Sequence, residues 1–379
     1  MTKSLLIAAP YLDNIGGTEI EAVTTAVHFW DSGEYNKVTL FSPEKINAEL
    51  FLDMIGTRAI TYLKYPSFFK TQWVGLFNRL FYKMGASLNC SEYLFWKYNS
   101  VKFDDFFILT YPKSTYFFPI IKNKSQLKKY IAKITMWQFE PLPSAHIPYY
   151  KKLRNIIVFN REQKYFWQSK NQLKNTVSLD IMIPNEKQLL EANPFDFNKA
   201  NLTFGYLGRI SREKNIEDML YLLDFLNNKH NRNCKLIIQG KGEETYVKEI
   251  NTLIKELSLT ETVTLENEFL SPTNTHYFFE KIDIFLVTSK NEGGPMTALE
   301  AAACGRMVMG YDIGAMKERF GHLPYMVNTN FDELCTSVLN FMDLEPFAKS
   351  NLLSEVRNHY IVSLSNSNKG NALLNLFKD

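Results

Sequence analysis

The chain has 379 residues, of which 45% are hydrophobic and 22% are charged. This composition is typical of a globular protein and argues against a disordered or fibrous chain, and the length is enough for two domains of ordinary size. No window holds the roughly 18 to 20 apolar residues that cross a bilayer, and the apolar run of residues 5–9 meets Pro10 too early for the core of a signal peptide. We therefore expect a cytoplasmic protein.

The charges are unevenly distributed along the chain. Residues 1–184 contain 23 Lys and Arg against 14 Asp and Glu, a net charge of +9, whereas residues 185–379 have a net charge of −6. A basic half favours an anionic partner such as a membrane, a phosphorylated acceptor or nucleic acid, although uneven surface charge without a partner is equally compatible. The four cysteines are scattered, without metal-ligand spacing or the density of a disulfide framework, so we expect reduced thiols in the core.

Short apolar runs in the first half predict strands at residues 4–9, 38–41, 106–109, 133–136, 156–159 and 177–181. The first strand leads through a polar loop to Gly16 and Gly17, and then to an apolar-periodic helix that extends to about Trp30. Consecutive glycines at such a junction let backbone N–H groups approach an anion closely, but a simple turn before a helix is equally compatible. The spacing matches neither a dinucleotide fingerprint nor a Walker loop, which counts against a nicotinamide oxidoreductase.

The segment of residues 64–97 is basic and aromatic. It contains five Lys and Arg against the single acid Glu92, interleaved with Phe, Tyr and Trp. Such a segment can lie in a membrane interface, with its cations at the lipid headgroups and its rings at the acyl boundary. A lysine run between Lys122 and Lys133 would extend this basic face. We expect an anionic membrane surface as a partner and no nucleic acid, while an ordinary aromatic core helix stays open.

From residue 201 onward, short apolar runs alternate with amphipathic helical segments, and the predicted strands are residues 202–207, 235–239, 263–265, 284–287 and 307–310. This alternation predicts a parallel, doubly wound sheet that binds ligands at the carboxyl ends of its strands. The polar stretch with Pro184 and Pro194 is the best linker. We therefore place a first Rossmann-like domain at 1–184 and a second at 185–355, followed by a helical segment, 356–379, that is able to cross back to the first domain.

Two glycine-rich turns follow predicted strands of the second half. Gly208 ends the strand 202–207 and precedes Arg209 and Lys214, which would place cations at the edge of the sheet where a phosphate binds. Gly240 follows the next strand in the same way. A solvated loop with ion pairs four residues apart explains these residues equally well.

Residues 291–305 contain two glutamates in an otherwise apolar and glycine-rich stretch. If Glu292 and Glu300 lay on one helix, eight positions at roughly 100° each would leave them about 80° apart, on different faces. A Gly-Gly-Pro break instead makes Glu292 a loop residue and predicts a helix from about Met296 to Gly305. Glu300 then lies among small side chains with no cation on its own helix. It is either solvated or reserved for a ligand with hydroxyl groups.

These motifs resemble a known family. A Gly-Gly-x-Glu near the N-terminus, a Gly-Arg-x-x-x-Glu-Lys-Asn at 208–215 and two glutamates with seven residues between them are similar to the retaining glycosyltransferases of the GT-B fold, family 4. The resemblance covers nearly the whole chain and is weakest between residues 64 and 174. It implies an α/β protein of two Rossmann-like, doubly wound domains that face each other across a cleft.

The resemblance implies a role for each matching residue. Arg209 and Lys214 would neutralise the donor diphosphate and Glu292 would hold the donor sugar, so we group these three as catalytic residues. Glu300 would bind the ribose. The other implied donor-binding residues are glycines, loop residues and the helix start: Gly16, Gly17, Gly208, Gly240, Phe269, Leu270, Gly293, Gly294, Pro295, Met296 and Thr297.

The chain departs from the family pattern at one place. Many relatives carry a histidine near the reacting sugar after a middle strand of the first domain, whereas residues 134–141 of this chain contain none. Gln138 and Glu140 are our candidates there for contact with the donor or the acceptor. His146, a few residues further on, is more compatible with a structural role in a Pro-rich loop.

We therefore expect a retaining, metal-independent glycosyltransferase that transfers a sugar from a nucleotide diphosphate donor, with a UDP-sugar favoured, to a glycan or lipid-linked glycan acceptor. We expect no cofactor and no metal, because the chain has no Asp-x-Asp pair and the two cations would neutralise the leaving diphosphate. Such an enzyme would serve cell-surface polysaccharide or glycoconjugate synthesis at the inner face of the membrane. The alternative is an inactive nucleotide-sugar-binding scaffold or partner subunit of the same fold, which the missing histidine would explain.

Overall fold

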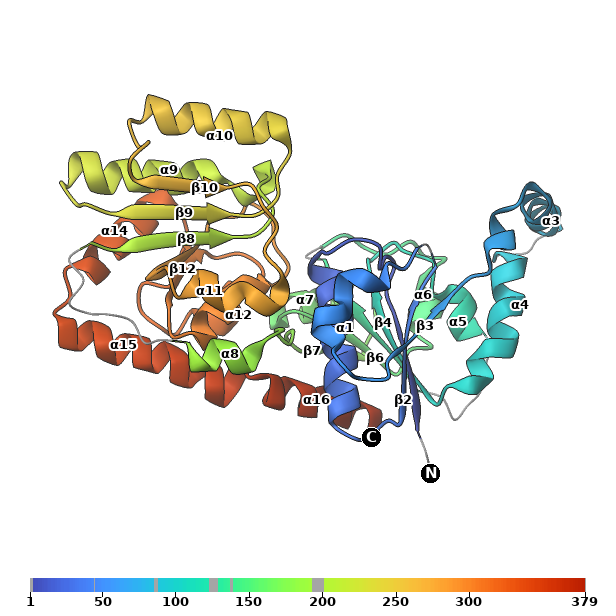
Figure 1. Ribbon diagram of the computed structural model, residues 1–379. Coiled ribbons are helices and arrows are strands. Elements are labelled where there is room, and N and C mark those ends of the chain that lie inside the picture. The colour runs from blue at the N-terminus through green and yellow to red at the C-terminus, as the bar shows by residue number, and fades with distance from the viewer. Residues whose placement is uncertain are drawn as a thin grey trace. The chain divides into compact units, whose positions relative to one another are not determined.

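The computed structural model describes residues 3–43, 45–84, 88–122, 129–136, 139–192 and 201–378. The chain divides into two compact units, the first made of residues 1–182 and 369–379 and the second of residues 183–368 (Figure 1). Each unit contains one parallel sheet with helices between successive strands. The predicted fold class, α/β with two Rossmann-like doubly wound domains, is confirmed.

In the described residues, the sheet of the first unit has seven parallel strands in the order β3-β2-β1-β4-β5-β6-β7. The strands are β1 (Ser4–Ala8), β2 (Lys37–Ser42), β3 (Thr61–Lys64), β4 (Asp105–Thr110), β5 (Lys129–Ile134), β6 (Asn155–Val158) and β7 (Thr176–Ser178). β3 has no counterpart among the predicted strands. β5 begins and ends earlier than the predicted strand 133–136.

Two hydrophobic clusters cover the two faces of this sheet. Leu5 and Ile7 of β1 join a cluster with side chains of the first and last helices, residues 17–31 and 366–378. Leu6 and Ala8 join a cluster with side chains of the helices between residues 90 and 170, because successive residues of a strand point to opposite faces. The helices of this unit are α1 (Gly17–Asp31), α2 (Leu52–Ile55), α3 (Gln72–Lys83), α4 (Cys90–Asn99), α5 (Phe118–Lys122), α6 (Ile147–Tyr150) and α7 (Arg161–Lys170), with α16 (Asn366–Lys378) returning from the end of the chain.

The sheet of the second unit has six parallel strands among the described residues, in the order β10-β9-β8-β11-β12-β13. The strands are β8 (Thr203–Leu207), β9 (Lys235–Gln239), β10 (Val263–Glu266), β11 (Ile284–Val287), β12 (Met307–Tyr311) and β13 (Val327–Asn328). The helices are α8 (Glu186–Glu191), α9 (Ile216–Asp224), α10 (Glu244–Glu256), α11 (Thr275–Phe279), α12 (Met296–Ala303), α13 (Met316–Phe320), α14 (Phe331–Met342) and α15 (Pro346–His359).

The chain crosses between the two units twice, after Met182 and after Asn368. Residues 356–368, which we predicted as part of the C-terminal helical segment, lie in the second unit. They include the end of α15 and a π-helical turn, Tyr360–Leu364. Within the described part of the chain, no helix is long and apolar enough to cross a membrane.

Candidate active site

In the sheet of the second unit, the order in which strands are added reverses between β8 and β11. The chain proceeds from β8 to β9 on one side, and β11 then pairs with the other side of β8. Loops that leave two such strands run in opposite directions, which opens a crevice at the carboxyl edge of the sheet. The loop after β8 carries Arg209 and Lys214, and the loop after β11 carries Glu292. The topology thus places the three proposed catalytic residues at the position where open α/β sheets bind ligands.

The β8 loop is held in shape by neighbouring side chains and backbone. The Tyr206 hydroxyl donates a hydrogen bond of 2.7 Å to the carbonyl oxygen of Arg209. Thr288, which follows β11, donates to the carbonyl oxygens of Lys214 and Asn215 at 3.1 and 3.0 Å. The backbone N–H of Lys290 donates to the carbonyl oxygen of Glu213 at 2.8 Å. These bonds join the two loops into one structure, and neither Tyr206 nor Thr288 was among the predicted site residues.

The predicted charged residues meet at the junction of these loops. The ammonium group of Lys214 forms an ion pair with Glu292, and the side chains are only 14% and 19% exposed. Ser289 donates a hydrogen bond of 3.3 Å to the same carboxylate oxygen of Glu292. Arg209 is paired with Glu213 at 3.1 Å but is 73% exposed, and an exposed pair of this kind contributes little to stability. Lys214 is therefore fixed in position, whereas Arg209 is free to reorient toward an anion.

The two predicted glycine turns lie directly against each other. A Cβ atom on Gly240 would overlap the carbonyl oxygen of Gly208, and Gly240 has φ of +149°, which side chains rarely tolerate. The N–H of Gly242 donates at 2.8 Å to the side chain of Asn267 in the loop after β10. Phe269 in that loop is 51% exposed, and its neighbour Leu270 is half-buried. The carboxyl edge thus brings together the loops after β8, β9 and β10.

The loop after β12 packs against the segment from Glu292 to the start of α12. A Cβ atom on Gly314 would overlap the carbonyl oxygen of Gly293, and the N–H of Ala315 donates to that oxygen at 3.0 Å. Gly314 has φ of +58°, so glycine is favoured at this position. The Arg319 guanidinium donates at 2.7 Å to the carbonyl oxygen of Pro295. These contacts fix the backbone that precedes the helix.

Helix α12 begins at Met296, as expected, with Pro295 as its N-cap residue. Gly294, Met296 and Thr297 are half-buried, and the first N–H groups of any α-helix have no partner within the helix. The helix ends at Ala303, two residues before the predicted Gly305. The N–H groups of Gly305 and Arg306 donate to the carbonyl oxygens of Ala302 and Ala301, a Schellman motif that requires the positive φ of Gly305.

Glu300 lies in the second turn of α12 and is only 2% exposed. The interpretation of Glu300 as a solvated residue is therefore wrong. Its carboxyl group accepts a hydrogen bond of 3.2 Å from Thr275, the first residue of α11. Burial raises the pKa of Glu300 to about 8, although the hydrogen bond from Thr275 acts in the opposite direction. Thr275 was not predicted, because it is 25 residues away in the sequence.

In the first unit, Gly16 and Gly17 lie at the start of α1, after β1. The sheet order reverses between β1 and β4, so this loop also borders a switch point. Gly16 is the N-cap residue, and its carbonyl oxygen accepts from the N–H of Ile20 at 2.9 Å. Gly17 is exposed, and a Cβ atom there would meet nothing within 4 Å. The buried carboxylate of Glu19 lies beside Gly16, where a Cβ atom would come within 2.6 Å of it.

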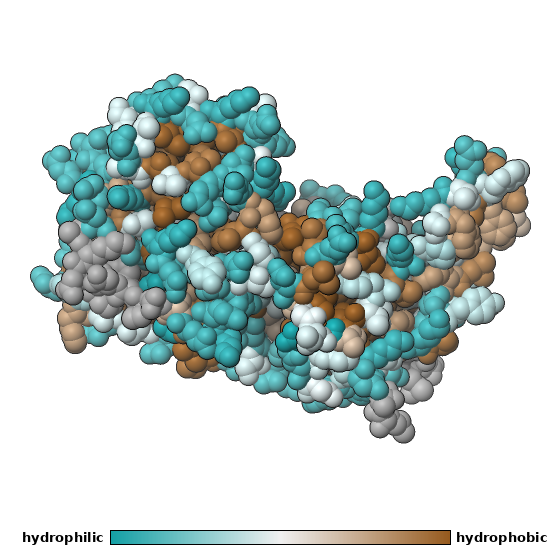
Figure 2. All heavy atoms as spheres, in the orientation of Figure 1, coloured by the Kyte–Doolittle hydropathy of each residue, from teal (hydrophilic) through white to brown (hydrophobic). Residues whose placement is uncertain are grey.

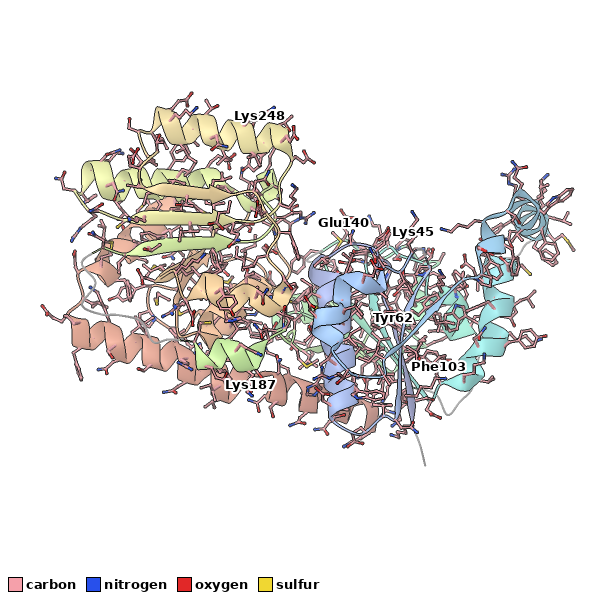
Figure 3. All side chains as sticks on the ribbon, viewed as in Figure 1. Lys45, Tyr62, Phe103, Glu140, Lys187 and Lys248 are labelled. Atoms are coloured by element: carbon pink, nitrogen blue, oxygen red, sulfur yellow. The ribbon has the colours of Figure 1, made fainter. Side chains whose placement is uncertain are left out.

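Of the two acceptor-side candidates, Gln138 lies outside the described residues. Glu140 lies at the carboxyl edge of the first sheet, opposite the edge that holds Phe103 (Figure 3). It forms an exposed ion pair with Lys113, which follows β4. Lys133, which we expected to contribute to a basic face, is instead buried and paired with Glu21 of α1 at 2.8 Å. The side chain of Lys133 supports the packing of α1 on the sheet, and that expectation is wrong.

Comparison with known proteins finds a family match in the second half of the chain. Residues 190–348 match the family described as glycosyl transferases group 1. The chain is 27% identical over 195 residues to the amylovoran biosynthesis glycosyltransferase AmsD of Erwinia amylovora, a match that covers 50% of this chain and 53% of that protein. The chain spans about half the length of the curated relatives it matches.

Solved structures resemble the whole chain. HepE of Anabaena, in complex with UDP and glucose, gives a TM-score of 0.71 at 14% identity and covers 100% of both chains. A variant of TarM of S. aureus, in complex with fondaparinux, alpha-GlcNAc-glycerol and UDP, also gives a TM-score of 0.71 at 14% identity and covers 100% of both chains. At this level of identity the likeness establishes the fold, which is that of the GT-B glycosyltransferases.

Proposed function

We propose that this protein is a retaining glycosyltransferase of family 4 that moves a sugar from a nucleotide diphosphate donor to a glycan or lipid-linked glycan acceptor. The observation that carries the proposal is the convergence of Lys214, Glu292 and the start of α12 at the switch point of the second sheet. This edge offers a fixed cation, an exposed cation in Arg209, and N–H groups at a helix start that have no partner within the helix, which suit a diphosphate. The match to the group 1 family over residues 190–348 supports it.

In the proposed reaction, the bond between the anomeric carbon and the diphosphate oxygen breaks, and a bond from that carbon to an acceptor hydroxyl oxygen forms. The electron pair of the broken bond stays on the leaving diphosphate, which also receives the proton of the acceptor hydroxyl. Arg209 and Lys214 stabilise the negative charge that develops on the diphosphate. Because these cations provide charge neutralisation, we propose that the reaction needs no divalent metal and no cofactor. Glu292 would hold the sugar, and Glu300 would bind the ribose.

The donor and the pathway are proposed by comparison with the similar proteins. HepE was solved with UDP and glucose, and a TarM variant with fondaparinux, alpha-GlcNAc-glycerol and UDP, so we favour a UDP-sugar as donor. AmsD is named for amylovoran biosynthesis, which favours a role in cell-surface polysaccharide or glycoconjugate synthesis. We further propose a cytoplasmic location at an anionic membrane surface, supported by the basic charge of residues 1–184.

The decisive experiment incubates the purified protein with a panel of nucleotide sugars and membrane extract, with and without a chelator. We expect one donor, a UDP-sugar, to be consumed equally in both conditions and its sugar to enter the extract with the anomeric configuration of the donor. Loss of transfer with the chelator would disprove metal independence, and an inverted product would disprove retention. Nucleotide binding without transfer to any acceptor would favour the inactive scaffold.

Two variants of one loop make this test specific for the site. Lys214→Ala removes the fixed cation and should lower kcat by about 100-fold or more, since a cation aimed at developing charge acts mainly in the transition state. Arg212→Ala is the matched control, because Arg212 is 68% exposed and pairs with Glu249 on α10. It should retain nearly full activity. Equal kinetics for the two variants would refute the assignment of Lys214.

A further inference from the structure

Helix α3 exposes most of its large hydrophobic side chains. Trp73 is 82% exposed, Met84 at the C-cap position is 73% exposed, and Leu76, Phe77 and Leu80 are between 45% and 56% exposed. Asn78 is the buried residue of this helix. Figure 1 shows α3 beyond the outer end of α4, and Figure 2 shows hydrophobic side chains on its surface. An amphipathic helix normally turns its apolar side to the core, whereas the apolar side of α3 faces solvent.

Five of the six exposed large hydrophobic residues of α3 and its C-cap form a single stripe, and the sixth, Tyr82, lies outside it. The spacing of these five, 73, 76, 77, 80 and 84, places them within an arc of about 100° on the helix surface. Arg79 and Lys83 are exposed and lie along one border of this arc. We call these seven residues the α3 stripe. A stripe of apolar side chains bordered by cations is the arrangement of a helix that lies in a membrane interface.

On the side of α3 opposite the stripe, hydrogen bonds join the helix to the start of α4. The side chain of Asn78 accepts hydrogen bonds from the N–H groups of Cys90 and Ser91 at 3.1 and 3.2 Å, and it donates to the Ser91 hydroxyl at 3.1 Å. Asn78 therefore holds the start of α4, whose Trp96 is fully buried in the core of the first unit. Because Asn78 lies about 150° around the helix from the centre of the stripe, these bonds hold the stripe outward.

Two interpretations of residues 64–97 are open, a membrane-interface segment and an aromatic core helix, and helices α3 and α4 fit them differently. α4 is an aromatic core helix, since Trp96 packs edge-on against Phe41 at 4.7 Å. α3 is not, because its aromatic Trp73 and Phe77 are exposed. Among the described residues of this segment, α3 carries the largest group of exposed hydrophobic side chains, although Leu94 and Tyr98 of α4 are exposed as well.

The charge around α3 indicates the kind of partner. Residues 64–91 contain four Lys and Arg and no Asp or Glu, although the protein as a whole has nearly equal numbers of both signs. A second copy of this chain would oppose cation to cation at a symmetric contact, whereas an anionic lipid surface attracts each Lys or Arg by about 1 kcal/mol. Lysine and arginine also reach headgroups while their stems lie along the apolar boundary.

We propose that the α3 stripe inserts into the interface of an anionic lipid bilayer, with α3 parallel to the surface and Arg79 and Lys83 at the headgroups. This rests on the proposed association with a membrane and assigns it to one helix. Trp73, Leu76, Phe77, Leu80 and Met84 enter the boundary between headgroups and acyl chains. The first unit thus contacts the surface from which a lipid-linked acceptor is presented.

The test measures co-sedimentation of the full chain with vesicles of phosphatidylcholine alone and of phosphatidylcholine with phosphatidylglycerol, without donor or acceptor. Trp73→Ser combined with Leu80→Ser should lower the partition coefficient on the anionic vesicles by about tenfold or more. Arg79→Gln combined with Lys83→Gln should lower it by about tenfold on the anionic vesicles and leave the weaker binding to neutral vesicles unchanged.

The matched control is Tyr165→Ser combined with Lys170→Gln on α7, because Tyr165 is 74% exposed and Lys170 is also exposed. This variant should sediment like the parent protein. Equal sedimentation of parent and stripe variants would overturn the proposal. A dimer in solution that the stripe substitutions dissociate, or binding of the stripe to single-stranded nucleic acid in preference to vesicles, would also overturn it.

Calorimetric titration of UDP into the same variants distinguishes this proposal from the proposed function. All stripe variants should bind UDP like the parent, since α3 belongs to the first unit and Lys214, Glu292 and Glu300 belong to the second. If the parent binds vesicles but not UDP, the donor site is wrong and the α3 proposal stands. If it binds UDP and transfers sugar but does not bind vesicles, the α3 proposal is wrong and the function stands.

Discussion

Glu300 shows how burial changes the chemistry of a single side chain. Its carboxyl group is buried and accepts a hydrogen bond from Thr275. Burial favours the neutral form, which is why the pKa rises to about 8. Below that pH most of the ligand-free protein holds Glu300 protonated. Ribose hydroxyls that donate to this group would favour the carboxylate, so binding of a nucleotide is expected to release a proton near neutral pH.

The raised pKa of Glu300 also makes the free energy of unfolding depend on pH. The folded carboxyl group has a pKa of about 8 against an ordinary value of 4.5, so between these values the folded state binds the proton and the unfolded state does not. The free energy of unfolding therefore decreases as the pH rises from 4.5 to 8. The Glu300→Gln variant does not lose stability in this way. Between pH 4.5 and pH 8, its free energy of unfolding relative to that of the parent should increase by as much as ~4 kcal/mol. Urea denaturation at pH 5, 7 and 8.5 measures this difference.

Glu256→Gln, at an exposed position on α10, is the control for removal of a surface carboxylate. Its stability relative to the parent should change little with pH. If Glu300→Gln and the parent instead lose stability in parallel as the pH rises, Glu300 is not the buried group that the structure describes.

At the scale of elements, the carboxyl edge of the second sheet is a set of loops in direct backbone contact. The turns at Gly208 and Gly240 leave no space for a side chain between them. Gly208 donates through its N–H to the carbonyl oxygen of Gln239 at 3.0 Å, and Gly240 donates to that of Glu266 at 3.0 Å. The loops after β8 and β9 are thus held together by close backbone contact.

Gly240→Ala should therefore destabilise the second unit by ~2 kcal/mol or more, because the methyl group overlaps the Gly208 carbonyl oxygen and φ of +149° strains an alanine. Urea denaturation of the purified variant checks this. Gly75→Ala is the matched control, since a Cβ atom there meets nothing within 4 Å and Gly75 lies inside α3. It should be neutral or stabilising by up to ~1 kcal/mol. Equal stability of the two variants would contradict the close approach of the loops.

Local patterns predicted much of this edge from the sequence. The Gly-Gly-Pro break predicted the start of α12 at Met296, and apolar runs predicted β9 and β11 at their observed bounds. β3 was missed because it is a short edge strand whose residues are partly exposed and show no apolar run. Thr275, Thr288 and Gly314 were missed for another reason. Their roles depend on contacts between residues far apart in the chain, which no local pattern records.

At the scale of the whole molecule, the last helix completes the core of the first unit. Phe377 of α16 packs edge-on against Phe29 of α1, with ring centroids 5.7 Å apart. Lys369, at the beginning of the returning segment, is buried and lies 3.6 Å from the carboxylate of Asp180. The first unit is therefore built from two segments of chain that are separated by the entire second unit.

This arrangement predicts that a change near the end of the chain destabilises the first unit. Phe377 is 1% exposed, so Phe377→Ala should lower the free energy of unfolding by about 3–5 kcal/mol. Phe347→Ala is the same substitution at a residue that is 77% exposed on α15, and it should change stability by less than ~0.5 kcal/mol. Chemical denaturation followed by tryptophan fluorescence compares them. Similar losses for both would show that α16 is not part of the core.

The return of α16 also sets an order for synthesis on the ribosome. Every strand of the first unit is translated before residue 183, yet part of the cluster that covers one face of its sheet, the side chains of α16, is translated after the second unit is complete. A nascent chain that stops before Lys369 therefore holds all the residues of the second unit, while the first unit still exposes the apolar surface that Leu373, Leu374 and Phe377 will cover. The first unit is translated before the second unit but completes its core after it, and during that interval its uncovered apolar surface is open to aggregation or to a chaperone.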